Sequence, residues 1–211
     1  MIKYAPLLFF YFLSTGSAKN FNAPVAGNWF VKSKAITVAP AQTPVPSAFL
    51  VIPGKRIGMS TLNGSATTLY KSLGKPSSED ASMGGKSLIT WTSKSVATNE
   101  VNIYFNTPHF GTLHAQPKAQ VIRVTSPRFM TQQKVGVGAA LAQIQKYFKN
   151  VKKIASYMSP KTQQEVAIYD DIKSGIAFEI NQQQNCVGIT VHKVGEDPLV
   201  IYQGLFDEVK Q

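Results

Sequence analysis

The segment that decides the fold runs from residue 138 to residue 149 and reads GAALAQIQKYFK. Its apolar side chains Leu141, Ile144 and Phe148 recur at i, i+3 and i+7, while glutamines and lysines occupy the other face. This spacing predicts an amphipathic helix that is entered through Gly138. The runs that follow it are apolar or alternating and are separated by Gly and Asn residues, so they predict three strands, at residues 166–169, 176–180 and 187–191.

A similar order of elements precedes this segment. Ala66, Leu69, Tyr70 and Leu73 give one apolar helical face, which Asn63 or Ser65 can cap and which Gly74 and Pro76 end. Strand-like runs follow at residues 88–91, 101–105 and 121–124. The sequence therefore predicts an α+β fold built from two tandem αβββ units with antiparallel sheets.

The predicted organisation of the chain has four parts. Prolines and small residues make residues 37–47 read as extended and linker-like, because proline fixes φ and withholds a hydrogen-bond donor, and the folded part is expected to begin near Phe49. The predicted parts are a signal peptide at residues 1–18, a Pro-rich segment at 19–48, a first αβββ unit at 49–130, and a second unit with a C-terminal tail at 131–211.

Two stretches resemble a known family. Gly64 to Pro76 with Trp91, and Gly138 to Lys149 with Tyr169, are similar to the SmpA/OmlA-like small lipoproteins of outer-membrane barrel assembly. Two such units in tandem resemble the secreted β-lactamase inhibitor proteins. The resemblance implies a fold used to contact other proteins. The chain lacks the lipobox cysteine that anchors the assembly lipoproteins, and no inhibitory loop is found in it, so the resemblance transfers no functional residues.

The N-terminus predicts export. Lys3 precedes an apolar run at residues 5–13, and Gly16 and Ala18 sit at the −3 and −1 positions of a peptidase site. This run is shorter than the roughly 20 residues that a membrane-spanning helix needs. No later stretch of the sequence is long and apolar enough to span a membrane. We therefore expect a soluble mature protein in the bacterial periplasm or outside the cell.

The charge predicts an anionic or protein partner. The formal net charge is +11, which favours either another protein or an anionic envelope component, although a generally basic, solvated surface would also account for it. The basic residues are spread along the chain, and the only arginines are Arg56, Arg123 and Arg128. We therefore expect no specific nucleic-acid binding.

We expect a non-enzymatic binding module for a protein or an envelope component. An antiparallel sheet packed on one face by helices would leave its other face free. Trp91, Tyr104 and Arg123 are candidate contact residues on that exposed sheet, with burial in the core as the alternative for Trp91. The competing hypothesis is a cell-envelope hydrolase or transferase whose site is assembled from distant residues.

No motif in the sequence indicates catalysis, a metal or a cofactor. Gly84-Gly85-Lys86-Ser87 resembles the end of a phosphate-binding loop, but a strand-like run follows it, so it predicts a turn. His109, His114 and His192 are expected in surface loops, because no cysteine or carboxylate pair nearby completes a zinc site. Cys186, the only cysteine, lies in an alternating run and is expected to be a small buried apolar residue.

Overall fold

The computed structural model describes residues 43–211, except residues 83 and 97. The predicted signal peptide and residues 19–42 of the predicted Pro-rich segment lie outside the described residues. The helices are a short 3-10 helix at Ser47–Phe49, α1 (Ala66–Leu73), α2 (Leu141–Tyr147) and α3 (Leu199–Leu205).

Two sheets accompany these helices in the described part of the chain. The larger has nine strands in the order β13 (Val209–Lys210), β9 (Lys152–Met158), β10 (Glu165–Asp171), β11 (Ile176–Ile180), β12 (Cys186–His192), β7 (Lys118–Val124), β6 (Glu100–Asn106), β5 (Lys86–Thr92) and β4 (Ser78–Ser82). The smaller has four in the order β3 (Ser60–Thr61), β2 (Arg56–Ile57), β1 (Leu50–Ile52) and β8 (Met130–Thr131).

Eight strands of the nine-stranded sheet form two meanders that meet at their last strands, and β13 pairs with β9 at one edge. The first runs from β4 to β7 and the second from β9 to β12, and β7 pairs antiparallel with β12 so that Arg123 lies opposite Thr190. Every neighbouring pair in this sheet is antiparallel, whereas β1 and β8 of the small sheet are parallel. The α+β class is confirmed, and both predicted units contribute to one sheet.

Local chemistry accounts for the boundaries of α1. The hydroxyl of Ser65 accepts a hydrogen bond of 3.3 Å from the backbone N–H of Thr68, which satisfies one free amide of the first turn. Gly74 follows the helix with a φ of 80°, a conformation that glycine adopts without steric cost. Of the two predicted caps, Ser65 is therefore the one used, and the predicted stop at Gly74 is confirmed.

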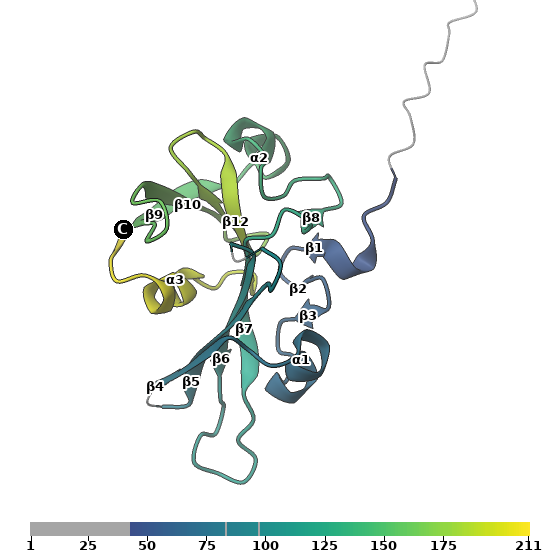
Figure 1. The fold of residues 1–211 in the computed structure, drawn as a ribbon, viewed down its shortest axis with the longest axis vertical. Helices are drawn as coiled ribbons and strands as arrows, with labels where there is room; N and C mark the ends of the chain where they lie inside the picture. The colour runs from purple at the N-terminus through teal and green to yellow at the C-terminus, as the bar shows by residue number, and fades with distance from the viewer. Residues whose placement is uncertain (1–42, 83, 97) are drawn as a thin grey trace, which may run out of the picture. The chain divides into compact units, whose positions relative to one another are not determined.

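The two faces of the large sheet carry separate cores. One face packs against α1, α2 and the small sheet through residues that include Leu69, Ile144, Ile57, Trp91 and Phe178. The other face packs against α3 through residues that include Ile201, Tyr202, Val121, Tyr157 and Ile168. Figure 1 shows α1 and the small sheet on one side of β7 and α3 on the other. Because α3 is short, it covers only part of its face.

The structure corrects the predicted units. Each of α1 and α2 is followed by four strands, because β4 and β9 precede the three that the sequence predicts. The described side chains of β4 are exposed and, apart from Ala81, polar, so this edge strand lacks the apolar alternation that marks a half-buried strand. The sequence analysis also misses α3, which directly follows Pro198. This helix has only 7 residues, too few for apolar spacing to reveal a helical period.

In the described part of the chain, no helix has both the length and the apolar character that crossing a membrane requires.

Candidate functional site

Polar side chains from both meanders meet on the α3 face, at the seam between β7 and β12. Val121 and Arg123 are two residues apart on β7, so both side chains point to the same face. Val121 packs in the core around α3, which places Arg123 on that face. Across the seam, Gly188 of β12 lies opposite Glu179 of β11. The register therefore sets Arg123 and Glu179 diagonally across β12.

Arg123 and Glu179 form a buried, two-pronged ion pair. Nε of Arg123 lies 2.6 Å from Oε1 of Glu179, and NH2 lies 2.6 Å from Oε2. Arg123 is 5% exposed and Glu179 is 0% exposed. A Cβ at Gly188 would meet the Glu179 carboxylate, with Oε2 only 2.7 Å away. The glycine thus provides the space in which the carboxylate lies.

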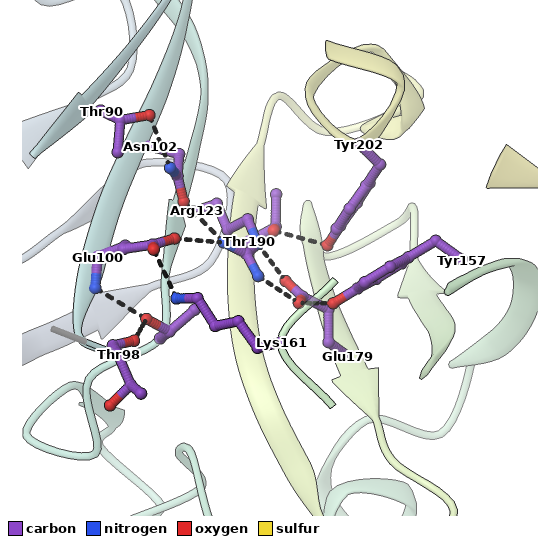
Figure 2. Close-up of polar contacts among 11 residues, drawn as sticks. Thr90, Thr98, Glu100, Asn102, Arg123, Tyr157, Lys161, Glu179, Thr190 and Tyr202 are labelled. Atoms are coloured by element: carbon purple, nitrogen blue, oxygen red, sulfur yellow. Dashed lines mark hydrogen bonds and ion pairs between the residues drawn. The ribbon is translucent and has the colours of Figure 1, made fainter. Parts of the chain in front are cut away.

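Neutral side chains complete the hydrogen bonding of this pair. Oδ1 of Asn102 accepts from NH1 of Arg123 at 2.7 Å, and Nδ2 of Asn102 donates to Thr90 at 3.0 Å. The hydroxyl of Tyr157 donates to Oε2 of Glu179 at 2.7 Å. Figure 2 shows this chain of contacts running from β5 through the seam to β9. Among the described residues, every buried side-chain nitrogen and oxygen has a hydrogen-bond partner.

A second, more exposed ion pair lies beside the first. Nζ of Lys161, in the connection between β9 and β10, donates to Oε1 of Glu100 on β6 at 2.6 Å. The other Glu100 oxygen is 3.7 Å from NH1 of Arg123. The Glu100 side chain is 19% exposed and that of Lys161 is 50% exposed. This pair therefore links the two meanders at the edge of the network (Figure 2).

Aromatic rings close the network on the side of α3. Phe206, which follows α3, stacks on Tyr157 with ring centroids 3.7 Å apart and an angle of 6° between the rings. The guanidinium carbon of Arg123 lies 5.6 Å from the centre of the Phe206 ring, within the range of a cation–π contact. The hydroxyls of Tyr202 and Thr190 share a hydrogen bond of 2.7 Å. Rings therefore cover the ion pair on the side that faces α3.

Burial and the Glu179 charge set the protonation states. Burial raises the pKa of Tyr157, and the Glu179 carboxylate raises it further, against an opposing effect of Arg123. Burial and then Glu179 also raise the pKa of Tyr202. For Arg123, burial acts to lower the pKa, but the charge and hydrogen bonds of Glu179 hold it above its usual range. The tyrosines therefore stay neutral and Arg123 stays charged.

We expect stability to fall at alkaline pH because of these tyrosines. In the unfolded chain they ionise near pH 10, whereas their folded pKa values are higher, so their contribution is complete below pH 10 and is lost above it. Above pH 10, each of these tyrosines lowers the free energy of unfolding by up to about 1.4 kcal/mol per pH unit. Urea unfolding measured from pH 9 to pH 11 should show that the free energy of unfolding falls less steeply with pH for Tyr157→Phe than for the unchanged protein. Equal slopes would contradict the assignment.

A cavity of about 590 Å³ opens beside the network. Its charged lining residues are Arg123, Lys161, Glu100 and Glu179, and its apolar ones are Val137, Pro160, Val166, Val187, Leu205 and Phe206. The remainder carry hydroxyl or amide groups: Thr90, Thr98, Asn102, Thr125, Tyr157, Ser159, Thr162, Gln164, Asn181 and Gln183. This volume is within the range of small-molecule sites, about 300–1,000 Å³.

The floor and the rim of this cavity differ in what they offer a ligand. The hydrogen bonds of the floor are made internally, between Arg123, Glu179 and their partners. At the rim, Gln164 and Gln183 are exposed, and among the described residues their side-chain amides form no hydrogen bond. The cavity thus combines a preformed floor with free amide groups at its edge.

The three predicted contact residues do not share a face. Arg123 lies in the network, and Tyr104 is half-buried against the core around α3 without lining the cavity. Trp91 is 6% exposed and packs in the opposite core, where its Nε1 donates to the carbonyl of Gly74 at 2.9 Å. The prediction of one exposed sheet bearing all three is therefore wrong, because Trp91 lies on the other face and Arg123 is buried at 5% exposure. For Trp91, the structure has the predicted alternative, which is burial in the core.

The histidines lie away from the cavity. His109 and His114 are exposed in the connection between β6 and β7, as predicted. The prediction of a surface loop is wrong for His192, because β12 extends through it and buries it at 0% exposure. Nε2 of His192 lies 2.9 Å from Oδ1 of the buried Asp170. Neither residue of this pair lines the cavity.

The predicted character of Cys186 is confirmed. It is 1% exposed, and burial raises the pKa of its thiol. In the described part of the chain, no group of three or more His, Cys, Asp or Glu side chains is placed to hold a metal ion.

Neither a protein-family model nor a curated protein matches the chain. It is similar to an extracellular protein containing an SCP domain from Bacillus anthracis, at 13% identity and a TM-score of 0.45 over 80% of this chain and 53% of that one. It is also similar to a DUF4309 family protein from Bacillus subtilis, at 14% identity and a TM-score of 0.41 over 66% of this chain and 88% of that one.

A third similar structure is a cysteine-rich secretory protein from Staphylococcus aureus, at 10% identity and a TM-score of 0.40 over 71% of this chain and 48% of that one. This chain spans about half the length of the Bacillus anthracis and Staphylococcus aureus proteins. At TM-scores below 0.5, none of these likenesses assigns a family or a function to this chain.

Proposed function

We propose that this protein is a non-enzymatic binding module and that its ligand occupies the cavity beside the Arg123–Glu179 pair. We further propose that the ligand is an uncharged, hydrogen-bonding segment of an envelope component, of the kind an oligosaccharide presents. The observation that carries the proposal is the mixed lining of the cavity, in which hydroxyl and amide side chains are interspersed in a mainly apolar surface around a preformed floor.

The charges of the lining support an uncharged ligand. Its two cations and two carboxylates cancel formally, and each cation is already within 2.6 Å of a carboxylate oxygen. A charged ligand would have to separate these pairs, which costs free energy. The positive charge of the chain lies mostly outside this cavity, so an anionic partner would contact another part of the surface.

The same pairing argues against catalysis in this cavity. A general acid or base needs a group that can exchange a proton near neutral pH. Both carboxylates of the lining, Glu179 and Glu100, lie in ion pairs, and the pKa of Tyr157 is well above its usual value. No histidine or cysteine is among the residues that line the cavity. The competing hydrolase or transferase hypothesis therefore finds no support there.

We expect the rim amides to contribute to affinity. Each hydrogen bond to a ligand contributes about 0.5–1.5 kcal/mol, so the double variant Gln164→Ala/Gln183→Ala should bind about 10-fold more weakly. Calorimetric titration with neutral oligosaccharides, chitotriose and maltotriose among them, measures this. The two substitutions lie on exposed side chains and should leave the stability within about 0.5 kcal/mol.

Gln182 provides the matched control. It lies beside Gln183 in the connection between β11 and β12 but does not line the cavity, so Gln182→Ala should bind as the unchanged protein does. If none of the neutral oligosaccharides binds, or if both variants bind equally well, the proposed ligand class is wrong.

We include in this proposal the tandem origin of the two units, the family resemblance and the export of the protein. A helix followed by a four-stranded meander occurs twice, at α1 to β7 and at α2 to β12, which supports an origin by tandem duplication. The resemblance to SmpA/OmlA-like lipoproteins and to the β-lactamase inhibitor proteins, and export to the periplasm or the exterior, likewise stay proposals. A binding module that contacts envelope components fits all three.

A further inference from the structure

Two large apolar side chains are exposed together on the β6–β7 loop, residues 107–117. Phe110 is 65% exposed and Leu113 is 101% exposed. Figure 1 shows this loop extending beyond the end of the sheet, away from α2. Exposed apolar side chains that gather at a projecting site mark contact with a partner or a membrane more often than isolated ones do.

The loop holds these side chains in a defined arrangement. The backbone N–H of Thr107 donates to the carbonyl of Gly85 at 2.8 Å, and the N–H and hydroxyl of Thr112 both donate to the carbonyl of His109, at 3.1 and 2.8 Å. One side of the Phe110 ring lies against Gly85, where an added Cβ would come within 2.7 Å of the ring. The loop is therefore a built turn that presents the rest of Phe110 and all of Leu113 outward.

The charges around the loop are positive. Residues 101–164 contain no Asp or Glu. At the base of the loop, Asn106 of β6 lies between Lys86 of β5 and Lys118 of β7 in the register of the sheet. Glu100 lies at the opposite end of β6, and on β4, the strand next to β5, Asp80 lies opposite Leu88, two residues along β5 from Lys86. An apolar tip with lysines at its base matches the order of acyl chains and anionic headgroups in a lipid surface.

We infer that the β6–β7 loop is a docking site for an anionic lipid surface. Phe110 and Leu113 enter the boundary between headgroups and acyl chains, and the lysines at the base of the loop lie at the headgroups. A protein partner fits less well, because a narrow loop with two apolar side chains offers far less than the roughly 1,000 Å² that a stable protein interface buries. The inference is independent of the cavity and of its ligand.

Vesicle sedimentation tests this inference with the chain from residue 19 onward. We expect binding to vesicles of equal parts phosphatidylglycerol and phosphatidylcholine, and at least 10-fold weaker binding to phosphatidylcholine alone. The variant Phe110→Ser/Leu113→Ser should lose at least 10-fold in affinity for the anionic vesicles. The control Met59→Ser/Val194→Ser removes two exposed apolar side chains outside the loop, which are 66% and 61% exposed, and should bind normally.

Fluorescence supplies a second readout that does not depend on loss of binding. The Leu113→Trp variant should show a blue-shifted emission with anionic vesicles and quenching by brominated acyl chains, relative to the unchanged protein. Absence of binding to anionic vesicles, or equal binding by the loop variant and the control variant, would overturn the inference. So would emission from Leu113→Trp that stays unshifted on bound protein.

Discussion

Replacing Glu179 with alanine is expected to lower the free energy of unfolding by about 3–5 kcal/mol. The substitution leaves the Arg123 guanidinium buried at 5% exposure without its carboxylate, and it removes the acceptor of the Tyr157 hydroxyl. An unpaired charge in the interior costs far more than the small net gain from forming the pair. Urea unfolding followed by circular dichroism measures the loss.

Two further variants show whether the unpaired charge causes this loss. Arg123→Met/Glu179→Leu replaces the pair with apolar side chains of similar length and should recover most of the stability, since buried pairs are often replaceable in this way. Lys161→Ala breaks only the more exposed pair with Glu100 and should cost less than about 1 kcal/mol. A loss below about 1 kcal/mol for Glu179→Ala would contradict the buried network.

Replacing Gly188 with alanine is expected to lower the free energy of unfolding by about 1–3 kcal/mol. The added methyl group would meet the Glu179 carboxylate, whose Oε2 lies 2.7 Å from the Cβ position. Gly188 is not among the described residues with a positive φ, so alanine can adopt its backbone conformation. The expected loss therefore comes from the collision of the methyl group with the ion pair. The same unfolding measurement applies.

A second background tests whether the carboxylate is the cause. In an Arg123→Met/Glu179→Ala background the carboxylate is gone, and Gly188→Ala should then cost less than about 0.5 kcal/mol. An unchanged cost in that background would mean that the methyl group collides with something other than Glu179, and that the glycine does not serve to make room for the carboxylate.

Much of the fold could be predicted from the sequence, because apolar residues recur at regular spacing in its central strands and in two of its helices. Leu141, Ile144 and Phe148 mark the buried face of α2, and all three are core residues. β4 could not be predicted, since an exposed edge strand made mostly of polar residues shows no apolar alternation. The pairing of β7 with β12 is a long-range contact, and no local spacing encodes it.

Part of the site carried a readable signal. Arg123 stands in the apolar run Val121 to Val124, and Glu179 stands in the apolar strand Ile176 to Ile180. A charged residue on a buried strand needs a partner of opposite charge, so these two could have been matched before the structure. Tyr157 could not, because β9 has only weak alternation. For Trp91, the alternation along β5 shows that its side chain points to the opposite face from those of the adjacent residues. It does not show which face of the sheet packs against the rest of the protein.

The central claim is that the ligand binds in the cavity beside the Arg123–Glu179 pair, and amide chemical shifts test it most directly. Nitrogen-15 spectra of the protein would be recorded during titration with chitotriose. The account predicts shifts concentrated at residues 159–164, at 181–187 and in the side-chain amides of Gln164 and Gln183. Shifts confined to the opposite face of the sheet, around α1 and the small sheet, would contradict it.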